Sequence, residues 1–67
     1  MIKAKTIRIV DSLNNEVKFY TQHDYDIEYK WLTDTRIHIV VDPKDKTIRR
    51  KEDFKLFLGS FNIFIEN

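Results

Sequence analysis

The stretch Thr35–Val41, with the sequence TRIHIVV, decides the fold that we expect for this chain. Side chains at every second position share a face, so that Ile37, Ile39 and Val41 lie on one side and Arg36, His38 and Val40 on the other. This period of two is typical of a β-strand. Runs with the same period flank the stretch on both sides, so we predict that it is the central strand of a small antiparallel sheet.

The rest of the chain divides into short alternating runs separated by residues that favour turns. The loop Asp11–Asn15 is predicted to join two strands of a hairpin, because Asn and Asp tolerate left-handed backbone angles and bond to their own backbone. The stretches His23–Asp26 and Asp42–Lys46 predict two further turns. The first run alternates imperfectly, which favours an edge position. The further strands that we expect are residues 3–10, 16–22, 27–32, 47–50 and 61–66.

One segment, residues 52–58, fits two structures. As a strand, it points every second side chain from Phe54 onward into the core. As a helix, it gathers Phe54, Phe57 and Leu58 into one apolar stripe, with two acidic residues at its start and Gly59 at its end. These capping and stop signals favour one short helical turn near residues 52–58.

Together these elements predict an all-β fold, arranged as a small antiparallel barrel or a two-layer sheet of about five to six strands. We expect a single small β domain over residues 1–67, because the chain is near the lower limit of length for folding alone. Immunoglobulin-type sandwiches typically take about 100 residues. We therefore favour a closed barrel of the SH3-like or OB-like kind.

The composition indicates a folded chain that is stabilised by apolar burial alone. Cysteine is absent, 42% of the residues are hydrophobic, and five are Phe. A charged fraction of 34% with one Gly and one Pro argues against disorder. No stretch approaches the roughly 18 apolar residues of a membrane helix, and no signal peptide is evident, so we expect a cytoplasmic protein without membrane contact. Abundant Ile, Lys and Asn indicate an AT-rich genome, such as that of a low-GC bacterium or its phage.

The faces of the predicted strands indicate which aromatic side chains fill the core. In the second strand, Val17 and Phe19 share one face and Tyr20 lies on the other. In the third strand, Tyr29 and Trp31 share a face with the isoleucine that precedes them. We therefore expect Tyr29 and Trp31 in the core rather than on the surface.

Catalytic chemistry has little support in the sequence. The two serines, Ser12 and Ser60, lie in predicted turns without a neighbouring base, and Gly59 alone cannot form a phosphate-binding loop. His23 and His38 would bind a divalent metal only if the fold brought them together with a carboxylate, which their spacing does not require. We expect no enzyme activity, no metal, no cofactor and no small-molecule substrate.

A basic cluster follows the predicted central strand and is the basis of an alternative function. A basic turn and strand can follow the phosphates of a nucleic acid, as small β-barrel binding proteins do. The net charge of +1 gives little long-range attraction to nucleic acid, which counts against this alternative. The candidate phosphate contacts are Lys44, Lys46, Arg49, Arg50 and Lys51.

An excess of apolar side chains favours protein–protein contact as the function. Val40, Phe57 and Phe64 fall opposite the main apolar set, and apolar residues left outside a core mark a partner surface. An edge strand, either Arg36–Val41 or Phe61–Glu66, is also able to add to the sheet of another chain. We expect a non-catalytic binding module that contacts a protein partner or itself as a homo-oligomer, and that serves as a small phage or bacterial modulator.

Overall fold

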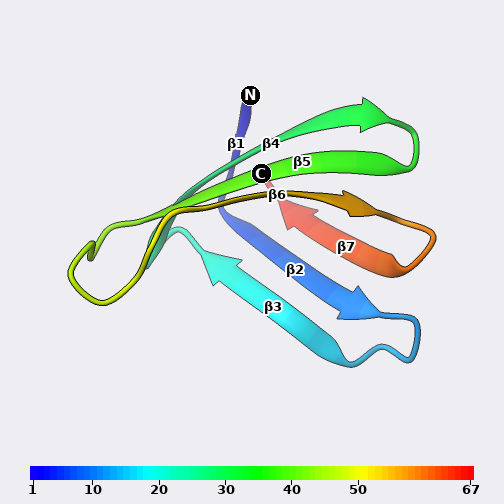
Figure 1. Cartoon of the computed structure of the whole chain (residues 1–67), viewed down its shortest axis with the longest axis horizontal. Helices are drawn as coiled ribbons and strands as arrows, with labels where there is room; N and C mark the ends of the chain where they lie inside the picture. The colour runs from blue at the N-terminus through cyan, green and yellow to red at the C-terminus, as the bar shows by residue number, and fades with distance from the viewer.

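Every regular element of the structure is a β-strand, and the computed structural model describes all of residues 1–67. The strands are β1 (Ile2–Ala4), β2 (Thr6–Asp11), β3 (Glu16–Thr21), β4 (Tyr25–Thr33), β5 (Arg36–Pro43), β6 (Glu52–Phe57) and β7 (Phe61–Glu66). They form a four-stranded antiparallel sheet in the order β1-β4-β5-β6 and a three-stranded one in the order β3-β2-β7 (Figure 1). The predicted all-β, two-layer arrangement is confirmed, with more strands than expected. The closed barrel that we favoured is wrong, because no ladder of paired strands joins the two sheets into one.

Strand β5 occupies the interior of the four-stranded sheet, as its alternation predicted. It pairs with β4 on one side and with β6 on the other, so that Ile39 lies between Tyr29 and Phe54. Its alternate residues are buried against the second sheet. Because both of its edges are paired, the expectation that Arg36–Val41 is free to add to another chain is wrong.

The N-terminal run belongs to two strands rather than one. β1 is an edge of the four-stranded sheet, whereas β2 is the centre of the three-stranded sheet, and the chain crosses between them at Lys5. The Lys5 amide donates a hydrogen bond to the Glu66 carbonyl at 2.7 Å. The crossing shifts the alternation by one position, which is why Ala4 and Ile7 are both buried. The single strand predicted for residues 3–10 is therefore wrong.

Two segments after β5 also differ from the prediction. Residues 47–50 form a loop instead of a strand, and Ile48 in this loop is 74% exposed. The helical turn predicted near residues 52–58 is wrong, because this segment forms β6. Pairing with β5 satisfies the backbone groups along one edge of β6, whereas a helix of this length is marginal in isolation. Since the chain has no helix, it has none that is long and apolar enough to cross a membrane.

The core lies between the two sheets, and pairing decides which face of each strand enters it. Tyr20 of β3 is only 3% exposed, whereas Val17 and Phe19 are exposed. Tyr20 lies opposite Ile7 in the ladder and therefore shares its buried face. The alternation separated Phe19 from Tyr20 but gave no indication of which face is inner. The buried core residues are Ala4, Ile7, Ile9, Tyr20, Ile27, Tyr29, Ile37, Ile39 and Val41.

The strands of the two sheets cross at an angle. In Figure 1 they overlap on the left, near the place where β3 turns into β4, and fan apart toward the right, where the turns after β2, β4 and β6 lie. Trp31 lies opposite Ile37 near the turn after β4 and is 42% exposed. The prediction that Trp31 fills the core is therefore wrong. Tyr29, which lies farther from this turn, is buried as predicted.

We predict that Ile39→Ala lowers the free energy of unfolding by about 2–5 kcal/mol, because it leaves a cavity at a fully buried position in the centre of β5. The matched control Ile48→Ala removes the same atoms from an exposed loop and is expected to change the stability by less than about 0.5 kcal/mol. Denaturant unfolding followed by far-ultraviolet circular dichroism measures both. Equal losses in the two variants would contradict the assignment of β5 to the core.

Candidate protein-binding groove

A groove of about 390 Å³ opens between the free edge of β6 and the second sheet. It forms because the four-stranded sheet ends at β6, whereas the three-stranded sheet extends past that edge to β3. Most of its lining is apolar. The lining residues are Ile9, Val17, Lys18, Tyr20, Glu52, Asp53, Phe54, Leu56 and Phe61.

Tyr20 closes one end of this groove by joining β3 to β6. Its hydroxyl donates a hydrogen bond to the Glu52 carboxylate at 3.0 Å. Its ring centre lies 5.1 Å from that of Tyr25, edge to face, and 6.4 Å from that of Phe54. Burial, together with the bond to Glu52, raises the pKa of Tyr20 above its ordinary value. Beyond Tyr20 the groove is open, and Phe54, like Leu56, stays half-buried.

Strand β6 has one edge without a partner. β5 pairs with its other edge along the whole strand, and no strand follows β6 in the sheet. An unpaired edge presents a row of free N–H and C=O groups that is able to bind another strand. Phe54 and Leu56 lie beside this edge in the groove, and Asp53 and Lys55 alternate with them along the strand. The site thus combines free backbone groups with an adjacent apolar surface.

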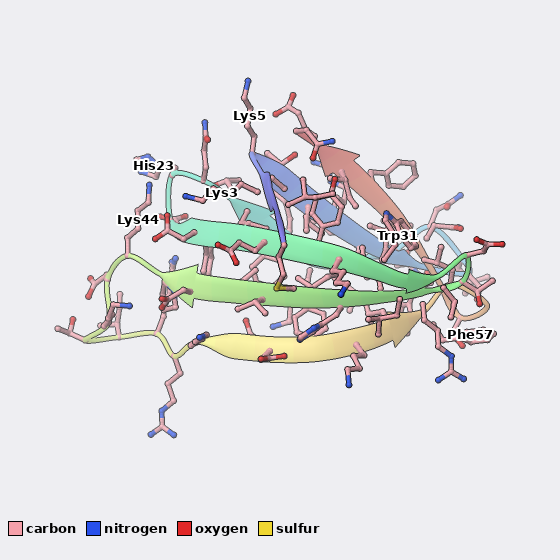
Figure 2. The ribbon with its side chains drawn as sticks, turned by 90° about the horizontal axis from the view of Figure 1, so that it is seen from above. Lys3, Lys5, His23, Trp31, Lys44 and Phe57 are labelled. Carbon is pink, nitrogen blue, oxygen red and sulfur yellow. The ribbon has the colours of Figure 1, made fainter.

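The three residues predicted to contact a partner do not form one surface. Val40 and Phe57 belong to the four-stranded sheet and lie on its outer face, where Val40 is half-buried and Phe57 is 49% exposed. The Phe57 ring covers Gly59 and leaves no room there for a Cβ atom, and the Arg36 guanidinium lies 5.7 Å from the ring centre. Figure 2 shows Phe57 at the same end of the molecule as Trp31. Phe64 lies on the outer face of the other sheet and is 59% exposed.

Phe64 belongs to a small aromatic cluster around Arg8. In the ladder, Arg8 lies between Phe19 on β3 and Phe64 on β7. Its guanidinium is 4.4 Å from the centre of the Phe19 ring and 3.2 Å from the Glu16 carboxylate, so its charge is compensated within its own sheet. Three strands of six residues present roughly 300 Å² of face, against the ~800 Å² per partner of a standard interface. This face alone is therefore too small for a stable protein contact.

The basic loop after β5 is held to the chain by acidic residues. The Lys46 ammonium lies 2.8 Å from the Asp42 carboxylate, and the Arg49 guanidinium lies 3.6 Å from that of Asp24. The hydrogen bond from Lys46 lowers the pKa of Asp42. Lys44 donates to a backbone carbonyl in the turn between β3 and β4. The three predicted phosphate contacts that form no ion pair in the chain are Lys44, Arg50 and Lys51.

The two histidines have separate surroundings. His23 lies in the turn between β3 and β4, on the same side as Lys44 in Figure 2. His38 lies on β5, and its Nε2 atom shares a hydrogen bond with the Asp53 carboxylate. No group of three or more His, Asp or Glu side chains is arranged to hold a metal ion.

The residues that line the groove were not among the predicted contact residues. In the strand interpretation of residues 52–58, Phe54 and Leu56 point into the core, and Phe61 begins the last predicted strand. In the structure all three are only half-buried, because the two sheets do not cover each other completely beside β6. The only sequence signal that pointed toward such a site was the general excess of apolar residues.

We predict that Tyr20→Phe lowers the free energy of unfolding by about 0.5–1.5 kcal/mol at neutral pH, because Glu52 loses its hydrogen-bond donor. The pKa of Tyr20 is raised above the ordinary value of 10.0, so the folded chain keeps a proton that the unfolded chain releases near that pH. The free energy of unfolding of the wild type therefore exceeds that of Tyr20→Phe by the full amount below pH 10, and this difference decreases as the pH rises further. Urea unfolding of both proteins from about pH 7 to about pH 11 measures this change, and a difference that is independent of pH would contradict it.

The groove, the free edge of β6 and the charges beside them form the candidate binding site of this chain. They come from residues of β2, β3, β6 and β7 that are distant in sequence. Comparison with protein-family models, curated proteins and solved structures found no match.

Proposed function

We propose that this chain is a small non-catalytic binding module that acts through protein–protein contact, as a cytoplasmic modulator in a bacterium or its phage. Its contact site is the free edge of β6 together with the groove beside it. The occupant is an extended polypeptide strand, which pairs with β6 and places every second side chain in the groove. The observation that carries this proposal is a half-buried apolar lining next to an unpaired strand edge.

The apolar lining supplies part of the binding free energy. Phe54, Leu56 and Phe61 are each half-buried in the isolated chain. Complete burial of such a side chain is worth about 1.5–3 kcal/mol relative to full exposure, and only the smaller part of each surface is still exposed, so the three side chains contribute roughly 1–2 kcal/mol in sum. Association costs about 4–15 kcal/mol in lost freedom. Backbone hydrogen bonds and the side chains of the partner must supply the difference, and we therefore expect modest affinity.

The shape of the groove suits a strand better than a small molecule. Its volume of about 390 Å³ is near the lower end of the roughly 300–1,000 Å³ that small-molecule sites occupy. Such sites bury about 70–90% of their ligand, whereas this groove lies open along the edge of β6. An added strand places only every second side chain in the groove, and its backbone and its other side chains stay outside. It therefore needs a surface that is open along its length.

We predict that linear peptides selected from a displayed library alternate apolar and polar residues and bind with micromolar dissociation constants. Leu56→Lys places a charge in the groove and is expected to weaken this binding at least about tenfold, which corresponds to about 1.4 kcal/mol. The matched control Phe64→Lys introduces the same charge on the outer face of the other sheet and is expected to retain the affinity. Fluorescence titration of a labelled peptide measures both variants.

The opposite pattern would contradict this assignment. Peptides that lose affinity with Phe64→Lys but keep it with Leu56→Lys would place the contact on the aromatic cluster around Arg8. Selected peptides without an alternating pattern would exclude strand addition. Circular dichroism of each variant establishes that its fold is intact before the affinities are compared.

The second candidate is nucleic-acid binding through the basic loop, and the specific observation in its favour is that Arg50 and Lys51 have no ion pair in the chain. Lys46 and Arg49 already have carboxylate partners, which reduces the charge available for phosphates. We predict that the protein flows through columns of single- and double-stranded DNA at low salt. Retention that moderate salt abolishes, and that Arg49→Glu with Arg50→Glu removes, would favour the nucleic-acid candidate instead.

A further inference from the structure

We propose that the strand accepted by β6 is the β6 strand of a second copy of this chain. The two strands run antiparallel about a two-fold axis at Phe54, so that the four-stranded sheets of the two copies become one continuous sheet. This inference rests on the proposed function, because it uses the same edge and the same groove, and it adds the identity of the occupant.

The charges on β6 favour one register for this pairing. Antiparallel partners share a face, so an axis at Phe54 places Asp53 of each copy opposite Lys55 of the other, and Phe54 opposite its own equivalent. Moving the axis by one residue sets either two Asp53 or two Lys55 side chains directly opposite each other, which is destabilising. An axis between two residues pairs inward side chains with outward ones. An axis at Leu56 also avoids like-charge pairs, but it leaves only Lys55, Leu56 and Phe57 of β6 with a strand partner, so charge and strand length together favour the axis at Phe54.

The two charged groups are available for this contact. Lys55 forms no ion pair within the chain. Asp53 receives a hydrogen bond from His38, but its side chain is 59% exposed and a carboxylate accepts several donors. The pairing thus gives Lys55 a partner and adds a second donor to Asp53, on both sides of the axis.

The apolar side chains of the groove support the same arrangement. A strand that adds to β6 extends the four-stranded sheet over the part of the second sheet that it leaves uncovered, near Val17 and Lys18. In the pair, Phe54 of each copy lies opposite its equivalent, at the edge of both grooves.

The other edges are less suited to a specific pair. β1 has only three residues, and β3 contains a bulge, because Val17 is an extra residue between the Ile9–Lys18 and Val10–Glu16 pairs. β7 has no charged residue before Glu66, so its side chains do not exclude alternative registers. It is the main competitor of β6, and the experiment below distinguishes the two.

The contact is expected to be weak. β6 has 6 residues and extends for only about 20 Å, and the area that two such strands bury is below the roughly 1,200–2,000 Å² of a standard interface. We therefore expect a reversible dimer with a dissociation constant in the micromolar range.

Sedimentation equilibrium of the wild type and of charge variants tests this proposal. We expect the wild type to dimerise, and Asp53→Lys and Lys55→Asp each to weaken the dimer about tenfold, because each variant creates two like-charged pairs across the axis. The double variant Asp53→Lys/Lys55→Asp restores opposite charges in the same register, and its dissociation constant is expected to return to within about threefold of the wild-type value. The control Lys30→Asp makes the same charge change on β4, away from the edge, and is expected to have little effect.

Several results would overturn the proposal. A wild type that stays monomeric up to millimolar concentration excludes the dimer, and a double variant as weak as the single ones excludes this register. A dimer that Phe64→Lys dissociates while the β6 variants leave it intact uses β7 instead. A mixture of Asp53→Cys and Lys55→Cys chains gives an independent measurement, because oxidation is expected to link the two variants to each other in preference to themselves.

The outcomes separate this inference from the proposed function. If the wild type is monomeric but selected peptides bind in the groove, β6 accepts a strand from a different protein and only the present inference fails. If neither peptides nor a second copy bind at β6, both fail. If the dimer forms with the expected charge dependence but no peptide is selected, β6 is specific for its own copy.

Discussion

The apolar core that the buried residues of β5 and β2 share is the feature on which the rest of the structure depends. Ile37, Ile39 and Val41 of β5 and Ile7 and Ile9 of β2 are almost completely enclosed, and each strand is an interior strand of its sheet. Only 11 of the 67 residues are buried, so a small number of side chains supplies most of the apolar burial. The crossing of the chain at Lys5 brings these two strands face to face, because β1 is tied to one sheet and β2 to the other.

The small core also explains why the groove exists. Two sheets of unequal width whose strands cross at an angle do not cover each other completely, and the uncovered part lies between β6 and β3. Tyr20 limits this opening at one end through its bond to Glu52 and its contacts with Tyr25 and Phe54. The apolar lining beyond Tyr20 is left partly exposed, since no further strand of the chain is available to cover it.

The edges of the two sheets differ in how strongly they resist nonspecific pairing. β1 is short and is followed by Lys5, β3 is interrupted by a bulge at Val17, and β6 alternates Asp53 and Lys55 along its outer face. On β6 these charges exclude most registers but favour one, so the same residues that discourage aggregation are able to specify a partner. β7 lacks such charges, and its free edge is the position where we expect nonspecific association to begin if the fold loosens.

The sequence by itself determined the all-β class, the central position of Arg36–Val41 and the approximate places of β3, β4, β5 and β7, because a period of two and turn residues are local properties. It also indicated the loop between β2 and β3, where Asn14 adopts a φ of 63° and the Asp11 carboxylate accepts two backbone hydrogen bonds. Only the tertiary structure decided that residues 52–57 form a strand, that the first run breaks at Lys5, and that Tyr20 is enclosed while Trp31 is not. Each of these outcomes depends on pairing with a strand distant in sequence or on how far one sheet covers the other. The groove beside β6 has the same origin, since alternation specifies the face of a strand but carries no information about what lies opposite it.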